Sequence, residues 1–98
     1  MKFAAVLELE LNADTLDQAR IVLHRVLEET RAFDGNLGVE VLVDHEDPAR
    51  WLILESWRSA EHDARYRTFR AGPGAITDLG PLLAAPPRLT TGHVDPQV

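Results

Sequence analysis

Apolar and polar residues alternate in three segments of the chain, and each alternation predicts a β-strand. The segments are residues 3–11, 37–43 and 51–57, and residues 88–94 predict a short last strand. Successive side chains of a strand point to opposite faces. In the third segment, WLILESW, one face therefore carries Trp51, Ile53, Glu55 and Trp57, and the other carries Leu52, Leu54 and Ser56. Both faces are largely apolar, so both are expected to be covered.

Apolar residues at helical spacing predict helices between these strands. The first is amphipathic, spans residues 14–32 and follows the cap oxygens of Asn12 and Asp14. Ser59 supplies a cap oxygen for a second helix at residues 60–70. Gly72-Pro73-Gly74 ends that helix, and a shorter helix is expected at residues 75–84.

The predicted order of elements, β-α-β-β-α-β, is typical of the ferredoxin-like α+β fold, an antiparallel sheet with helices on one face. We expect one domain over residues 1–94 and a tail over residues 95–98. Strand faces such as Phe3/Leu7/Leu9 or Leu52/Leu54 would expose apolar surface on a monomer. We therefore expect a homodimer in which two sheets pack face to face and form a shared α+β barrel.

Composition excludes several classes of partner. The 98 residues carry a net charge of −6, without a basic run, so the cationic surface that nucleic acids need is missing. The same charge argues against anionic membranes, and no apolar run reaches transmembrane length. The absence of cysteine excludes disulfides and thiolate catalysis and fits a reducing compartment. We expect a cytoplasmic protein that binds neither nucleic acid nor membrane.

Glu55 is the main candidate for a catalytic group. It lies between Trp51 and Trp57 on one strand face, and a carboxylate enclosed by apolar groups can serve as a general base if it reaches the proton to be removed. The alternative is a structural carboxylate held by a backbone donor or by an arginine, such as Arg58, Arg65 or Arg67.

Three further residues are candidates for the same site. His62 and Tyr66 are four residues apart on the second predicted helix, so they face the same way and could assist proton transfer beside Glu55. Glu8 is a second candidate acid if it points into the cleft under the helices; otherwise it belongs to a charged strand edge. The four histidines form no metal-binding pair of the HExxH type, so no metal site is expected.

Three stretches of the sequence resemble the antibiotic biosynthesis monooxygenase domain family, a group of dimeric α+β barrels. These stretches are Asp34-Gly35-Asn36-Leu37-Gly38-Val39-Glu40-Val41-Leu42, Glu55-Ser56-Trp57-Arg58-Ser59 and Leu79-Gly80-Pro81-Leu82-Leu83. The resemblance covers nearly the whole chain. It implies the dimeric barrel and a pocket for a small molecule.

The residues resemble the quinol monooxygenase branch most, because Glu55, Trp57 and His62 match its spacing. The Pro-His pair common in that family is replaced by Arg70-Ala71. Polyketide oxygenases of the family have asparagine where this chain has Ile53. Haem-degrading members have asparagine where it has Glu8, and no residue matches their iron ligand.

The resemblance implies a cofactor-independent monooxygenase that oxidises a small aromatic quinol or polyketide-like ring with O2. Glu55 would be the base and His62 would assist it. The ring would be bound by Trp57 and Tyr66, in a cleft that Trp51, Ile53 and Glu8 could also line. Two alternatives remain: a non-catalytic small-molecule binding protein on the same fold, and an isomerase whose anionic substrate is held by Arg65 or Arg67.

Overall fold

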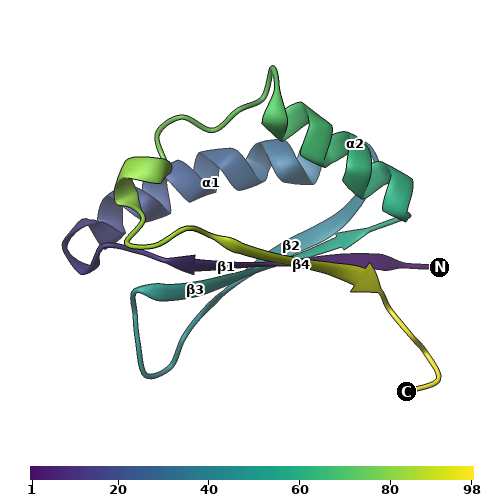
Figure 1. Ribbon diagram of the computed structural model, residues 1–98, viewed down its shortest axis with the longest axis horizontal. Coiled ribbons are helices and arrows are strands. Elements are labelled where there is room, and N and C mark those ends of the chain that lie inside the picture. Colours follow the sequence, from purple (N-terminus) through teal and green to yellow (C-terminus); the bar gives the residue numbers. More distant parts are fainter.

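The computed structural model describes residues 1–98 and consists of an antiparallel sheet with two helices on one face (Figure 1). The elements are β1 (Phe3–Glu10), α1 (Leu16–Ala32), β2 (Asn36–Val43), β3 (Arg50–Trp57), α2 (Ala60–Ala71) and β4 (Arg88–His93). Two short 3-10 turns, η1 (Ala13–Thr15) and η2 (Gly80–Leu82), precede α1 and β4. No helix has the length and apolar character needed to cross a membrane.

The strand order is β2-β3-β1-β4, and every neighbouring pair is antiparallel. Both crossovers place their helix on the same face of the sheet, as Figure 1 shows. The predicted ferredoxin-like α+β fold is therefore confirmed. The register pairs Phe3 with Trp57 and Leu9 with Trp51, which fixes the faces of the two central strands relative to each other.

The helix-facing side of the sheet holds the core. Leu9, Trp51, Ile53 and Trp57 are each at most 2% exposed, which confirms the predicted split of β3 into two faces. The expectation that the Phe3/Leu7/Leu9 face would be exposed on a monomer is wrong. The register with β3 turns this face of β1 toward the helices, where Phe3 and Leu9 are buried.

The opposite face of the sheet carries no covering element within the chain (Figure 1). Its apolar positions include Val6, Leu42, Leu52 and Leu54. Leu54 is opposite Val6 of β1, and Leu52 is opposite Leu42 of β2. Leu42 is 53% exposed, and the other three are partly exposed. We call this surface the open face.

The prediction of a helix at residues 75–84 is wrong. This segment is irregular, and only η2 has helical turns within it. A tertiary contact holds the segment instead: Arg25 of α1 donates two hydrogen bonds, of 2.7 and 2.8 Å, to the carboxylate of Asp78. The hydrogen bond from Arg25 lowers the pKa of Asp78, because it favours the ionised carboxylate.

Gly35 allows the close approach of the α1–β2 connection to α2. Its φ is +85°, a conformation that favours glycine, and a Cβ at this position would overlap the imidazole ring of His62. Replacing Gly35 by alanine should therefore lower the free energy of unfolding by about 1–3 kcal/mol, measured by urea denaturation. Gly92→Ala is the control, because no atom lies within 4 Å of a Cβ built there. Equal stability of the two variants would contradict this packing.

Candidate functional site

Glu55 is buried on the helix-facing side of β3. It is 3% exposed, and its Oε1 accepts a hydrogen bond of 3.1 Å from the indole Nε1 of Trp57. The same oxygen forms an ion pair with Nη2 of Arg67 on α2. Of the three arginines considered as partners for Glu55, Arg67 is thus the one that pairs with it.

Arg67 also binds a second buried carboxylate. Its Nε and Nη2 donate to Oδ1 of Asp63 at 3.2 and 2.9 Å, and Asp63 is 6% exposed. Asp63 and Arg67 lie one helical turn apart on α2, so the pair is favoured by helix geometry. One guanidinium therefore compensates two carboxylates at the boundary of helix and sheet. Without the Arg67 guanidinium, the burial of either carboxylate would lower the stability of the fold, because the charge would have no partner.

Tyr66 contributes an aromatic ring and a hydrogen-bond chain to the same region. Its ring centroid is 4.9 Å from that of Trp57, and its hydroxyl lies 2.6 Å from Oγ1 of Thr30. The Thr30 hydroxyl donates to the carbonyl of Val26, so Tyr66 is the donor to Thr30. Arg70 donates to the Tyr66 oxygen at 2.8 Å. This chain fixes the Tyr66 ring between α1, α2 and β3.

His62 lies at the beginning of α2, where it forms hydrogen bonds with Ser59. Its Nδ1 is 2.6 Å from the hydroxyl of Ser59, the N-cap residue of the helix, whose oxygen accepts from the backbone N–H of His62. The direction of the Ser59–Nδ1 hydrogen bond depends on the imidazole tautomer. Nε2 lies 3.8 Å from a carboxylate oxygen of Asp34. His62 has no hydrogen bond to Glu55 or Tyr66.

The helix start also affects Glu61. A hydrogen bond from its own backbone N–H, followed by one from Ser59, lowers the pKa of this exposed carboxylate. Negative charge in the first turn of α2 is favoured by the helix dipole.

The remaining candidates lie elsewhere. Glu8 is opposite Leu52 on the open face, where its carboxylate pairs with Arg50 at 2.8 Å; it does not point under the helices. Ile53 is a core residue, 1% exposed, and packs in the apolar cluster beneath α1. Trp51 lies at the other end of β3 and donates from Nε1 to the carbonyl of Pro48 at 2.8 Å.

We use the name Glu55 cluster for Glu55, Trp57, Asp63, Tyr66 and Arg67. The cluster is closed: none of the cavities in the structure is lined by any of these residues or by His62. No group of three or more histidine and acidic side chains lies together as a metal site would require.

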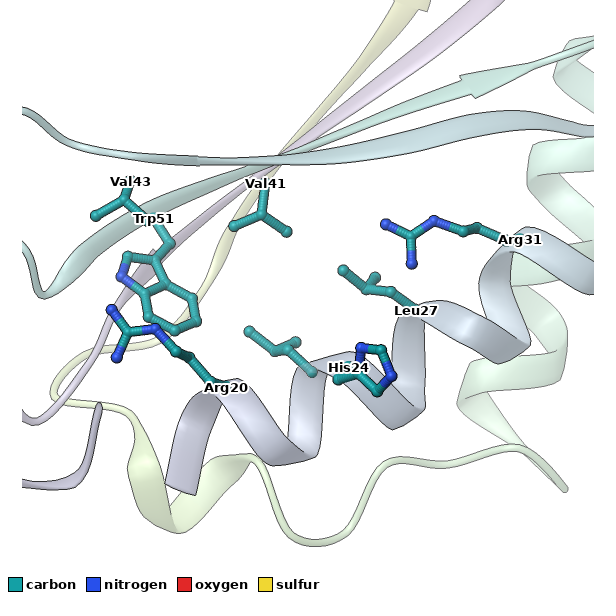
Figure 2. Close-up of a pocket in the computed structure, with 8 residues that line it drawn as sticks. Arg20, His24, Leu27, Arg31, Val41, Val43 and Trp51 are labelled. Carbon is teal, nitrogen blue, oxygen red and sulfur yellow. The ribbon is translucent and has the colours of Figure 1, made fainter. Parts of the chain in front are cut away.

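A separate hollow of about 280 Å³ lies between α1 and the outer part of the sheet (Figure 2). We call it the α1–β2 groove, and it is lined by Arg20, Leu23, His24, Leu27, Arg31, Val41, Val43 and Trp51. Trp51 is the only candidate from the sequence that borders it. The spacing of Arg20, His24, Leu27 and Arg31 along one side of α1 was the available signal for this groove.

Comparison with known proteins relates the chain to one family. Residues 2–75 match the family model described as antibiotic biosynthesis monooxygenase. A search of curated proteins gave no match to the sequence.

Solved structures share the fold at low sequence identity. A conserved protein from Methanosarcina mazei Go1 has a TM-score of 0.86 and 14% identity, over 97% of this chain and 94% of the other. A putative antibiotic biosynthesis monooxygenase from Deinococcus radiodurans has a TM-score of 0.82 and 22% identity, over 95% and 92%. Another, from Nitrosomonas europaea, has a TM-score of 0.78 and 15% identity, over 95% and 89%.

The arrangement of the Glu55 cluster predicts that the stability of the folded protein depends strongly on Arg67. Arg67→Met should lower the free energy of unfolding by about 3–5 kcal/mol, because it leaves Glu55 and Asp63 buried without a cation. Arg65→Met is the matched control, since Arg65 is on the same helix with a side chain 63% exposed; we expect a change within about 0.5 kcal/mol. Chemical denaturation measures both. Similar losses in the two variants would show that Arg67 is not the compensating charge.

Proposed function

The chain belongs to the antibiotic biosynthesis monooxygenase family, and from that membership we propose that it is a cofactor-independent monooxygenase. Its substrate is a small aromatic quinol or polyketide-like ring, and its oxidant is O2. The observation that carries this proposal is the buried Glu55 carboxylate, which lies between the indole N–H of Trp57 and the guanidinium of Arg67. An ionised carboxylate beside two aromatic rings can take a phenolic proton from a flat substrate.

The first step of the proposed reaction is proton transfer. Arg67 is shared with Asp63, so the guanidinium keeps a partner when Glu55 turns from it to the substrate hydroxyl. Glu55 accepts the phenolic proton and becomes neutral, and the substrate becomes an electron-rich anion. Arg67 then lies next to that anion, which its charge stabilises.

Oxygen chemistry follows on the substrate itself. The anion gives one electron to O2, and the resulting radical pair forms a carbon–oxygen bond, which yields a peroxide anion. Glu55 returns its proton to the terminal peroxide oxygen. Loss of water from the hydroperoxide removes the hydrogen of the carbon that carries it and converts that carbon to C=O, so that one oxygen atom of O2 enters the product and the other leaves as water. The substrate supplies all the electrons.

Substrate entry requires α2 to move away from β3, because the Glu55 cluster is closed. Two of the twelve residues of α2, Asp63 and Tyr66, are buried, and Tyr66 packs against Trp57 and Phe33, so the shift separates these rings and breaks the Glu55–Arg67 ion pair. At the C-terminal end of α2, Gly74 donates to the Phe69 carbonyl at 2.8 Å and accepts from Arg70 at 3.0 Å, so this end of the helix is tied to the connection that follows it.

A second candidate function is a non-catalytic small-molecule binding protein. Two observations favour it: Glu55 is committed to an ion pair, and His62 is held by Ser59 and Asp34 instead of by Glu55. Such a protein would gain thermal stability from an aromatic ligand without consuming oxygen, because a ligand that binds the native state stabilises it.

Turnover with anthrone and menadiol, followed by oxygen consumption, tests the catalytic proposal. We expect oxygen uptake above the uncatalysed rate for at least one substrate. Because Glu55→Gln removes the proton acceptor, this variant should lose about 10²–10⁴-fold in rate, whereas Arg65→Gln should retain full activity. Circular dichroism checks that both variants fold. A wild-type rate equal to the background, together with ligand-induced thermal stabilisation, would favour the binding protein instead.

We also propose that two copies of the chain associate through the open face and form the shared barrel. The apolar residues Val6, Leu42, Leu52 and Leu54 support this proposal, because each fully buried leucine or valine contributes about 1.5–3 kcal/mol. Glu8 and Arg50 pair beside them and would form part of a polar rim.

Sedimentation of Leu54→Glu tests the dimer. The introduced charge would be buried between two sheets, so we expect the wild type to sediment as a dimer at micromolar concentration and the variant as a monomer. Ile21→Glu is the control, because Ile21 is 72% exposed on α1 and lies on the other side of the sheet. A monomeric wild type would contradict the proposal.

A further inference from the structure

The α1–β2 groove has an apolar floor. Leu27 of α1 faces Val41 and Val43 of β2, and the indole of Trp51 closes one end (Figure 2). Leu23 of α1 also lines the groove. Its volume of about 280 Å³ is near the lower limit for ligand pockets, roughly 300–1,000 Å³. The floor therefore fits a body of one or two rings.

The groove is open because α1 covers β2 only in part. Val39 is 7% exposed, whereas Val41 and Val43, further along the same face of the strand, are 37% and 42% exposed. Valine side chains pack readily in a sheet core, so their exposure opposite the apolar residues of α1 marks a space that a ligand could fill.

The rim of the groove is cationic. Arg20, His24 and Arg31 border it. Arg20 pairs with Asp17 at 3.4 Å and His24 with Glu28 at 2.8 Å, so Arg31 is the bordering cation without an acidic partner. The guanidinium of Arg20 lies over the Trp51 ring, 5.4 Å from its centroid. It therefore extends the aromatic wall and also contributes charge.

Arg31 is the group best placed to bind an anion. Its Nη2 donates to the carbonyl of Val39 at 3.0 Å, which fixes the guanidinium between α1 and β2, where Figure 2 shows it pointing across the groove. The other nitrogens of this guanidinium make no hydrogen bond within the chain and can receive a carboxylate.

We propose that the α1–β2 groove binds a small aryl carboxylate. The ring lies on Trp51, Val41 and Val43, and the carboxylate is bound by Arg31, with Arg20 adding a second positive charge. A monoanion is favoured because the apolar floor is larger than the charged rim and a single guanidinium is positioned by the strand. This site is separate from the Glu55 cluster: Trp51 and Glu55 are four residues apart along β3, about 13 Å.

Titration calorimetry with 2-naphthoate tests the proposal, with 2-naphthamide as the uncharged counterpart. We expect 2-naphthoate to bind at least tenfold more tightly than the amide, and the difference to shrink at high salt, because exposed charge pairs are screened. Equal binding of the two compounds would overturn the proposal.

Variants locate the site. Arg31→Gln should weaken 2-naphthoate binding about tenfold, the loss of one charge-assisted hydrogen bond, and leave binding of the amide unchanged. Val43→Glu should abolish 2-naphthoate binding, because it puts a negative charge on the floor at a position that is already exposed. Arg65→Gln is the matched control and should bind like the wild type. Unchanged binding by both groove variants would contradict the assignment.

The two indole N–H signals in a proton–nitrogen correlation spectrum give an independent readout. The Trp51 signal should shift with 2-naphthoate and the Trp57 signal should not; the reverse would place the ligand at the Glu55 cluster. Because Glu55→Gln should bind 2-naphthoate with wild-type affinity, failure of this proposal can be distinguished from failure of the monooxygenase proposal.

Discussion

The ion pairs of Arg67 with Glu55 and Asp63 determine how the second helix sits on the sheet. Glu55 belongs to β3 and Asp63 to α2, so the guanidinium joins the two elements at the position where the core would otherwise be apolar. Two buried carboxylates are tolerated there only because one cation compensates both. The position of Trp57 and Tyr66, and hence the shape of any site between them, depends on this bridge.

The same sheet separates three surfaces with different chemistry. The helix-facing side of β3 carries the Glu55 cluster at one end and the wall of the α1–β2 groove at the other, while the open face carries Leu52 and Leu54. Alternation along this strand of eight residues separates the helix-facing side from the open face. On the helix-facing side, position along the strand separates the Glu55 cluster from the groove wall at Trp51.

Local pattern was enough to predict the fold, because strand alternation and helical spacing agree with the tertiary structure over most of the chain. It failed at residues 75–84, which are irregular apart from η2 and are held to α1 by the pairing of Asp78 with Arg25, a contact distant in sequence. Strand alternation also predicted that Glu55 lies among apolar side chains, and Arg67 was one of three arginines considered as its partner. The pattern could not select Arg67, because the pairing depends on how α2 is rotated on the sheet. The α1–β2 groove was missed, because the spacing of Arg20, His24, Leu27 and Arg31 marks one side of α1 but does not show how far that side lies from β2.

The small number of buried residues in α2 affects how this helix can move. A helix that rests on interlocking leucines can slide or roll by small steps, because each intermediate position keeps part of its contact area. With Asp63 and Tyr66 as its buried residues, α2 is held by the packing of the Tyr66 ring against Trp57 and Phe33 and by directional bonds that are either made or broken. Its displacement should be an all-or-none event with a defined barrier, so α2 should behave as a two-position switch.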